Sequence, residues 1–377
     1  MPPKRVLLLF LNTGGGHRSA ALAVSEALQE LYADQVDVSL VDVTAECFPW
    51  PLRELDAIYN RLVGWNGWPW APIYHLTDSP RRLSPLRDGW CLLTGRPIRR
   101  LLHNYAADVV VCCHPLLNAP LKEALRRQPC EIPLITLVTD LASAHAAWFY
   151  PPAEICLVAT EEAQRRAVAC GIPIDSVRLT GLPVRRCFIR AAEEDRGLAR
   201  RKLGLDPGVP VVLLLSGADG MGPFYALFQA LVTTQLRAQL VAITGRNERL
   251  AARLTSRRWP RPVHIRGFVE NIHEWMRAAD VLVTKAGPTT ITEALTVGTP
   301  MVLSGAVPGQ EPPNVPYVTE RGAGVWAPEP IQAAETVREL LSPKDGKLRW
   351  MTQRAREAGC PDAGEHVAEV IWRSIQR

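Results

Sequence analysis

The sequence has no apolar run long enough to cross a membrane. Its 377 residues contain no stretch near the roughly 20 apolar residues that a spanning helix needs. The apolar run 6–11 follows two basic residues, but it is too short for the core of a signal peptide, and no cleavage pattern follows it. We therefore expect any contact with a membrane to be peripheral.

Paired cysteines are also missing. The nine cysteines form no C-x-x-C pair, and Cys112 and Cys113 stand side by side in an apolar run that is typical of a buried strand. The pattern supports neither a zinc site nor a disulfide framework. Reduced thiols in a cytoplasmic protein are the simplest expectation.

A dense basic stripe of the kind that binds nucleic acid is not evident, so we expect no nucleic-acid partner. The overall charge is only mildly positive, because 43 basic and 38 acidic residues leave +5. This balance suits an anionic ligand or an anionic membrane surface but requires neither. The length exceeds that of one ordinary core and predicts two domains of similar size.

Apolar strands alternate with helical segments along both halves of the chain. The run 6–11 is a strand, a glycine loop follows it, and helical spacing extends from Arg18 to Leu31. Further strands are predicted at 36–43, 108–113, 133–138, 155–159, 209–215, 239–244, 263–266, 281–284 and 300–304, with helices at 116–127, 161–169 and 224–235. The alternation predicts an α/β protein with two doubly wound, mostly parallel sheets.

The domain boundaries follow from a change in composition. The charged segment 185–201 is predicted to be the linker between a domain at 1–190 and a second domain at 191–360. Residues 361–377 have helical spacing, and this tail is predicted to pack back on the first domain.

The segment 48–100 interrupts the alternation. It carries eight arginines against four acidic residues, and it holds five of the eleven tryptophans: Trp50, Trp65, Trp68, Trp70 and Trp90. Indole and guanidinium groups together suit the headgroup region of a membrane, so Trp65, Trp68 and Trp70 are predicted to contact membrane or acceptor. The alternative is a helical insertion whose tryptophans fill a core.

A glycine loop ending in histidine follows the first strand, with the sequence NTGGGH at 12–17. Glycines let a ligand approach the backbone closely, and the helix after them offers unpaired N–H groups to an anion. Gly16 is therefore predicted to lie near a bound ligand, the donor molecule of a transfer reaction. His17, with a reference pKa of ~6.5, is a candidate general base. The alternative is a structural turn whose histidine caps the helix.

Two more loops stand where strands of the second half end. In the loop 216–223, Met221 and Gly222 suit a pyrophosphate, although the Lys-Ser/Thr ending of a Walker loop is missing. The alternative is a flexible connection.

The run 284–294 places Pro288 at a first helical position, so that hydroxyls and N–H groups of the next turn can hold phosphate. A carboxylate one turn further on can accept both hydroxyls of a ribose, and polar side chains past the next strand suit a sugar. The residues concerned are Lys285, Gly287, Thr289, Thr290, Glu293, Gln310 and Glu311. The alternative is a surface helix and loop.

These groups suit a reaction in which a hydroxyl attacks and a diphosphate departs. The attacking hydroxyl needs a base, and the departing diphosphate needs positive potential, which helix N-termini with Arg246 or Lys285 can supply. No D-x-D pair stands at a strand end, which fits a reaction without a divalent metal.

Taken in order, the motifs closely resemble one family, the monogalactosyldiacylglycerol synthases and processive diacylglycerol glucosyltransferases. The resemblance covers nearly the whole chain and rests on GGGH at 14–17, TDL at 139–141 with His145 and with WF at 148–149, GLPV at 181–184, GMGP at 220–223, GRN at 245–247, GFV at 267–269, TKAGP at 284–288, PGQE at 308–311 and NVPY at 314–317. It implies a GT-B fold, that is, two Rossmann-like domains facing a cleft. It also implies an inverting, metal-independent transferase without a cofactor.

The resemblance further implies roles for single residues. His17 would be the base on the acceptor hydroxyl, and Asp140 would assist it or position the acceptor. The donor would be held by uracil contacts from Phe268 and Val269, a ribose contact from Glu293, phosphate contacts from Met221, Gly222, Thr289 and Thr290, and sugar contacts from Gln310 and Glu311.

The expected reaction is transfer of a hexose from a UDP-sugar donor to diacylglycerol, at the cytoplasmic face of an anionic membrane surface. Three alternatives remain open. They are a transferase acting on a polyprenyl-linked peptidoglycan precursor, a UDP-sugar epimerase, and a non-catalytic UDP-sugar-binding protein at the membrane surface.

Overall fold

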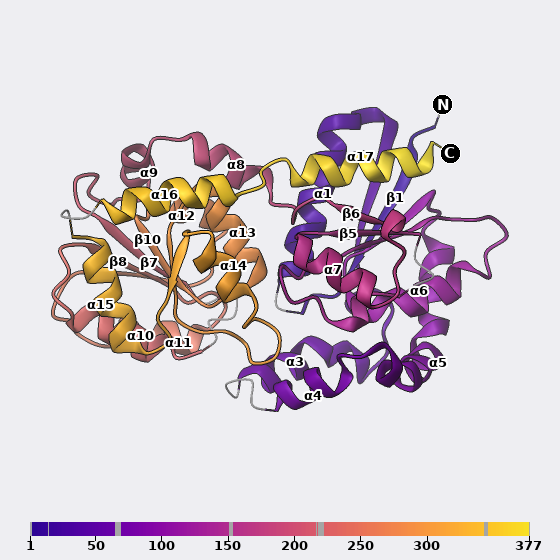
Figure 1. Ribbon diagram of the computed structural model, residues 1–377, viewed down its shortest axis with the longest axis horizontal. Coiled ribbons are helices and arrows are strands. Elements are labelled where there is room, and N and C mark those ends of the chain that lie inside the picture. The colour runs from indigo at the N-terminus through magenta and orange to yellow at the C-terminus, as the bar shows by residue number, and fades with distance from the viewer. Residues whose placement is uncertain are drawn as a thin grey trace. The chain divides into compact units, whose positions relative to one another are not determined.

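A computed structural model describes residues 2–376 except 14, 65–68, 151–153, 216, 218–221 and 343–345. It divides into two compact units, which are labelled by element in Figure 1. The N-terminal unit comprises Met1–Arg186 together with Pro361–Arg377, and the C-terminal unit comprises Cys187–Cys360. The last helix of the chain therefore belongs to the first unit.

A six-stranded parallel sheet in the order β2-β1-β3-β4-β5-β6 forms the centre of the N-terminal unit. Its middle strands are almost wholly apolar, because helices cover both faces of such a sheet and leave no solvated side. The strands are β1 (Lys4–Phe10), β2 (Val36–Asp42), β3 (Val109–Cys112), β4 (Leu134–Leu137), β5 (Ile155–Val158) and β6 (Val177–Leu179).

Helices pack on both faces of this sheet. On one face, α17 lies along α1 (Figure 1), and Trp372 stacks on Tyr32 with ring centroids 4.6 Å apart. The helices of the unit are α1 (Gly16–Tyr32), α2 (Val43–Cys47), α3 (Leu55–Gly64), α4 (Trp70–Thr77), α5 (Pro80–Asn104), α6 (Asn118–Leu125), α7 (Glu161–Ala169) and α17 (Ala363–Ile375), with short 3-10 turns η1 (Ala33–Gln35), η2 (Leu52–Glu54), η3 (Pro115–Leu117), η4 (Ala146–Trp148) and η5 (Ile174–Ser176).

The segment 48–100 is a helical insertion made of α3, α4 and α5. Trp90 donates its indole N–H to the carbonyl of Leu116 (2.8 Å), and Trp70 is partly buried with its ring centroid 5.2 Å from that of Tyr59. Trp50 is 79% exposed. The described tryptophans therefore divide between packing and surface, while Trp65 and Trp68 lie outside the described residues.

The C-terminal unit repeats the architecture with a parallel sheet in the order β12-β11-β10-β7-β8-β9. Its strands are β7 (Val211–Leu215), β8 (Gln239–Ile243), β9 (Val263–Arg266), β10 (Val281–Thr284), β11 (Met301–Leu303) and β12 (Gly324–Trp326). Its helices are α8 (Arg186–Glu193), α9 (Arg196–Lys202), α10 (Phe224–Thr233), α11 (Glu248–Thr255), α12 (Ile272–Ala278), α13 (Pro288–Val297), α14 (Asn314–Glu320), α15 (Pro330–Leu340) and α16 (Lys347–Ala358).

The predicted α/β class with two parallel sheets is confirmed, and every predicted strand is present within two residues of its expected ends. The short edge strands β6 and β12 were not predicted, because each has only three residues and a partly exposed pattern. The segment 185–201, expected to be the linker, contains the boundary between the two units, at Arg186 and Cys187, and it forms the helices α8 and α9. Its charge serves packing: the buried guanidinium of Arg200 donates to the carbonyl of Ala278 (2.9 Å).

Among the described residues, no helix is both long and apolar enough to cross a bilayer.

Candidate functional site

Each sheet has one switch point, that is, a pair of neighbouring strands from which the order of the strands along the chain runs outward in opposite directions. In the N-terminal unit this point lies between β1 and β3, and in the C-terminal unit it lies between β7 and β10. At the carboxyl ends of these two strands, the connecting loops lead to opposite faces of the sheet and leave a crevice between them. Open α/β sheets bind their ligands in this crevice. The residues at these two points are therefore the candidate site residues.

His17 lies at the N-terminal switch point, in the first turn of α1. The loop before it turns sharply, because Gly15 adopts the left-handed conformation (φ 79°) that glycine tolerates best. The Nδ1 atom of His17 is 2.7 Å from the hydroxyl of Thr139, which follows β4. Its ring centroid is 4.4 Å from that of His114, which follows β3, and 5.8 Å from that of Trp148.

Burial keeps this pair of imidazoles neutral. It lowers the pKa of His17 to about 4, and a hydrogen bond to the backbone of Cys113 opposes only part of that change. The pKa of His114 falls well below its usual value, through burial and because a second proton on the adjacent pair of rings would be repelled by one on His17. A neutral imidazole is the form that a general base requires, so His17 has the right protonation state at neutral pH, and its pKa of about 4 makes it a weak base there.

The tautomer of His114 follows from its contacts. Its Nδ1 atom accepts the backbone N–H of Leu116 (3.3 Å), so Nε2 carries the proton and donates it to the hydroxyl of Thr13 (3.0 Å). This bond ties the loop after β1 to the end of β3 and fixes the surroundings of His17.

Asp140 contacts a neighbour of His17. It is 6% exposed, and its Oδ2 atom accepts the indole N–H of Trp148 at 2.7 Å. The backbone carbonyl of Trp148 accepts a hydrogen bond from the side-chain amide of Asn118 (2.9 Å), so the backbone and the indole of Trp148 are each held by one hydrogen bond. Asp140 is thus placed to fix the ring that lies beside His17.

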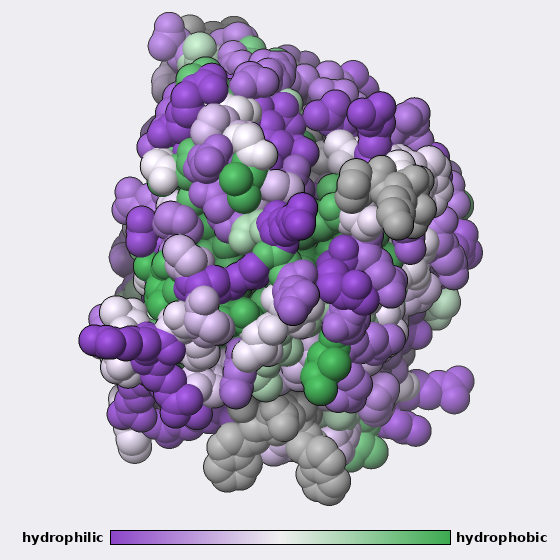
Figure 2. Space-filling view, turned by 90° about the vertical axis from the view of Figure 1, so that its left-hand side faces the viewer, coloured by the Kyte–Doolittle hydropathy of each residue, from purple (hydrophilic) through white to green (hydrophobic). Residues whose placement is uncertain are grey.

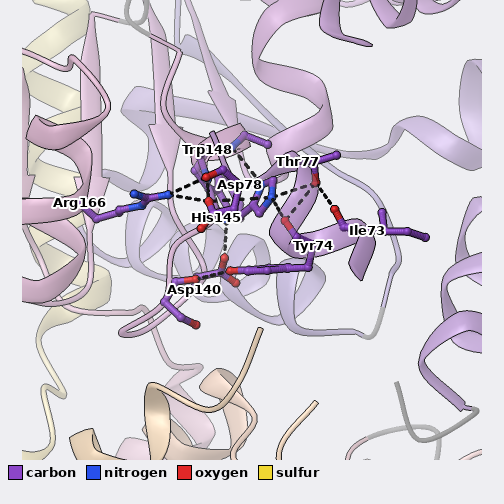
Figure 3. A network of polar contacts seen from close by, with 11 residues as sticks. Ile73, Tyr74, Thr77, Asp78, Asp140, His145, Trp148 and Arg166 are labelled. Atoms are coloured by element: carbon purple, nitrogen blue, oxygen red, sulfur yellow. Dashed lines mark hydrogen bonds and ion pairs between the residues drawn. The ribbon is translucent and has the colours of Figure 1, made fainter. Parts of the chain in front are cut away.

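A polar network joins the helical insertion to the turn that carries Trp148 (Figure 3). Asp78, just after α4, accepts hydrogen bonds from the guanidinium of Arg166 (2.6 Å) and from the backbone N–H of Ala146 (2.8 Å), the first residue of η4. The hydroxyl of Tyr74 in α4 donates to the carbonyl of Ser143 (2.8 Å).

His145 completes this network. Its Nδ1 atom accepts the N–H of Ala147 (3.1 Å), so Nε2 carries the proton, 3.2 Å from both the carbonyl of Tyr74 and the hydroxyl of Thr77. Figure 3 shows these bonds converging where α4 meets the loop after β4. Burial lowers the pKa of His145, with Asp78 acting against it, so a neutral ring holds the turn.

At the C-terminal switch point, Lys285 follows β10 and forms an ion pair with the buried carboxylate of Glu311. The other oxygen of Glu311 accepts the backbone N–H of Val307 (2.8 Å). A Cβ added at Gly287 would stand 3.0 Å from Nζ of Lys285, so glycine leaves room for the ammonium. Glu311 therefore positions a cation at the mouth of α13.

Helix α13 begins at this mouth. Pro288 occupies its first position, and Thr289, Thr290 and Glu293 are partly exposed on its first turns. The unpaired N–H groups of a helix start, together with hydroxyls and Lys285, form a site suited to a diphosphate. Gln310 is partly exposed on the loop after β11, next to Glu311.

Arg246 and Phe268 follow the neighbouring strands β8 and β9. The guanidinium carbon of Arg246 lies 5.9 Å from the centroid of the Phe268 ring, and Phe268 is 57% exposed. Val269 is partly exposed beside it. A large exposed ring of this kind is available to stack on a flat ligand.

Some predicted residues cannot be placed. Met221 lies outside the described residues, whereas Gly222 is described and adopts a positive φ of 85° before α10. The described residues hold no group of three or more His, Cys, Asp or Glu side chains that could bind a metal. Independence from metal remains a prediction.

Three residues of these contacts were not predicted as site candidates: Thr139 and His114, which contact His17, and Asp78, which binds the turn carrying Trp148. His114 had a usable signal, because it is a polar residue directly after an apolar strand, as His17 nearly is. Asp78 had none, since only the packing of α4 against the loop after β4 brings it near η4.

Comparison with known proteins gives matches over both units. A family model of monogalactosyldiacylglycerol synthases matches residues 17–184, and a model of the glycosyltransferase family 28 C-terminal domain matches residues 216–314. A monogalactosyldiacylglycerol synthase of Spinacia oleracea is 38% identical over 371 residues, covering 96% of this chain and 70% of the relative. For monogalactosyldiacylglycerol synthase 3 of Arabidopsis thaliana the values are 34% over 383 residues, 99% and 82%.

Solved structures resemble the fold over nearly the whole chain. MurG of Acinetobacter baumannii has a TM-score of 0.61 at 20% identity, covering 98% of this chain and 100% of that one. The UDP complex of MnaA from S. aureus has a TM-score of 0.64 at 14% identity, covering 99% and 97%. These likenesses confirm the predicted GT-B type of fold.

Proposed function

The chain belongs to the monogalactosyldiacylglycerol synthase family, and on that premise we propose that it transfers a hexose from a UDP-sugar to diacylglycerol. The single observation that carries the proposal is 38% identity to a synthase of that name along 96% of the chain. The chemistry of the two switch points agrees with it, because one holds a neutral base and the other holds cationic and N–H groups.

In this proposal the N-terminal unit binds the acceptor. The free hydroxyl of diacylglycerol lies at His17, whose neutral ring takes the proton as the oxygen attacks the anomeric carbon. Thr139 fixes the imidazole through Nδ1, and Asp140 acts on it indirectly by holding Trp148 beside it. Attack from the face opposite the leaving group inverts the anomeric carbon and gives a β-linked sugar.

The C-terminal unit binds the donor. The first turn of α13, with Lys285, Gly287, Thr289 and Thr290, receives the diphosphate. Met221 and Gly222, which follow β7 in the sequence, are proposed to contact it as well. As the bond from the anomeric carbon to the phosphate oxygen breaks, this positive potential stabilises the departing UDP. Arg246 adds charge at the end of β8.

Contacts to the rest of the donor complete the proposed site. Phe268 and Val269 receive the uracil, Glu293 accepts the ribose hydroxyls, and Gln310 meets the transferred sugar. Glu311 has both oxygens engaged by Lys285 and Val307, so its main part is to hold the ammonium in place. Gly16, in the first turn of α1, lets the donor approach the base.

The reaction takes place at a membrane, since diacylglycerol is insoluble in water. We place the enzyme on the cytoplasmic face as a peripheral protein, attached to an anionic surface through the insertion α3–α5. Exposed apolar side chains support this placement, among them Trp50, Leu86, Leu92 and Leu93.

The test is turnover with a panel of UDP-sugars in vesicles of phosphatidylcholine and phosphatidylglycerol, with and without diacylglycerol, and product analysis by mass spectrometry. We expect a monohexosyl diacylglycerol only when donor and diacylglycerol are both present. Loss of UDP-sugar without any acceptor would instead indicate an epimerase, and product formed only on a polyprenyl diphosphate-linked sugar would indicate a peptidoglycan-precursor transferase. No consumption of any UDP-sugar with any lipid would overturn the proposal.

A further inference from the structure

Residues 246–266 carry the positive charge of the whole protein. This arginine segment has seven arginines and one glutamate, a formal charge of +6, while the complete chain carries +5. The expectation that the chain lacks a dense basic stripe is therefore wrong. All but one of the seven are exposed, the exception being the partly buried Arg261: Arg246, Arg249, Arg253, Arg257, Arg258, Arg261 and Arg266.

The segment lies at one edge of the C-terminal sheet. It runs along α11 and through the following loop into β9, which is the last strand of the sheet. Charge on an edge strand commonly prevents pairing with another chain, and this accounts for Arg266. It does not account for the arginines of α11 and the loop, which do not lie on the edge strand.

Two of these arginines share one aromatic ring. The guanidinium carbons of Arg253 and Arg257 lie 3.8 Å and 5.3 Å from the ring centroid of Tyr225 in α10. A guanidinium packed on a ring is held in a fixed plane while the N–H groups at its edge remain available to an oxyanion. The arrangement brings like charges together, which is unfavourable unless an anion joins them.

Acidic partners are missing from this surface. In the described part of the chain, Arg249, Arg253, Arg257 and Arg258 form no ion pair. Some exposed arginines elsewhere pair with a glutamate one turn away, as Arg338 does with Glu335 and Arg373 with Glu369. The positive charge of α11 is therefore left for a partner.

We propose that Arg249, Arg253, Arg257 and Arg258 form a docking surface for the phosphates of an anionic lipid membrane. The proposal deepens the proposed function, since it names the part of the donor-binding unit that meets the membrane holding the acceptor. Guanidinium groups bind phosphate oxygens through two parallel hydrogen bonds, and each basic residue near an anionic leaflet adds to the attraction.

The surroundings favour a membrane over a nucleic acid. Single-stranded nucleic acids need exposed rings on which bases stack. Trp259, the aromatic residue inside the segment, is only partly exposed, because it packs edge-on against Phe228 and donates its N–H to the carbonyl of Leu254 (2.8 Å). Figure 2 shows a side of the C-terminal unit on which hydrophilic residues predominate and hydrophobic residues lie between them.

The test is sedimentation of the full chain with vesicles of phosphatidylcholine alone or mixed with phosphatidylglycerol, across a range of salt. For Arg253→Gln with Arg257→Gln we expect roughly tenfold weaker binding to the anionic vesicles at low salt and a shallower salt dependence, with unchanged binding to the neutral ones. The matched control is Arg338→Gln with Arg373→Gln, which removes the same charge from paired arginines and should bind like the parent.

Two results would overturn the docking surface. One is an equal loss of binding in the control, which would reduce the effect to net charge. The other is binding of a heparin or single-stranded DNA probe as tight as that of the anionic vesicles and equally sensitive to the variant. Transfer to diacylglycerol dispersed in neutral detergent should remain at the parent level in the variant. If the parent itself lacks that activity, the proposed function fails while the vesicle result still decides the docking surface.

Discussion

The two units have the same type of fold, and each has its own switch point, but different residues line the two points. Between β1 and β3, rings and hydroxyls crowd together, and burial keeps His17 and His114 neutral. Between β7 and β10, glycine, a helix start and the ammonium of Lys285 leave positive potential facing a ligand. One topology can therefore support the two proposed tasks, accepting a proton and holding a diphosphate, because the residues of the loops after the strands can vary without changing the sheet.

Removing the proposed base at the N-terminal switch point should cause the largest loss of turnover. For His17→Ala we expect a loss of turnover on the order of 10²-fold or more, since a positioned base contributes about that much, while UDP binding is retained. Steady-state kinetics and calorimetric titration with UDP measure the two quantities separately. A parallel loss of UDP affinity would show that His17 is structural and that the two switch points are not independent.

Removing the cation should affect the C-terminal switch point. Lys285→Met is expected to lower turnover about tenfold or more, because the departing diphosphate loses positive potential. It should also destabilise the unit by roughly 2 kcal/mol, because Glu311 is left as an unpaired buried charge.

A double variant separates these two consequences. Lys285→Met with Glu311→Gln removes both charges, so thermal unfolding should return toward the parent while turnover stays low. Recovery of turnover together with stability would argue against a role of Lys285 in the reaction.

Loosening the network of Figure 3 should give a smaller effect, confined to the N-terminal switch point. Asp78→Asn weakens the bonds to Arg166 and Ala146, so η4 and Trp148 lose part of their fixed geometry. We expect a roughly tenfold lower kcat with unchanged affinity for UDP, and partial rescue by Asp78→Glu. Glu335→Gln, which breaks the exposed pair with Arg338, is the matched control. A change in UDP affinity without a change in kcat would be inconsistent with positioning of the base.

The mildest test uses acidity alone. Burial disfavours the charged ring, so His17 stays neutral and active to lower pH than an ordinary histidine. The acid limb of kcat/KM should therefore report a pKa of about 4, the value of His17, and not ~6.5. Intrinsic fluorescence at each pH separates this limb from unfolding. An acid limb near the ordinary value would mean that the base is less buried than the structure shows.

Much of the fold could be predicted from the sequence, because a buried strand has a recognisable local pattern. The runs that became β1, β3 and β7 are continuous and apolar, and glycine or polar residues follow each of them. Strands β6 and β12 escaped because short, half-exposed strands carry little pattern. The arginine segment is visible in the sequence, but it does not form a compact basic stripe there, because its charge is spread over a helix, a loop and a strand.

The sequence by itself determined the two α/β units, the glycine loops and the residues that follow the strand ends, because each depends on neighbours along the chain. Only the tertiary structure decided that His17 contacts His114 and Thr139, that Asp140 binds Trp148, and that α4 fixes the turn carrying it. These contacts join residues that are far apart in sequence, and they form only when parallel strands place their carboxyl ends at one edge. The lowered pKa of His17 likewise depends on burial among those distant neighbours, which no local pattern encodes.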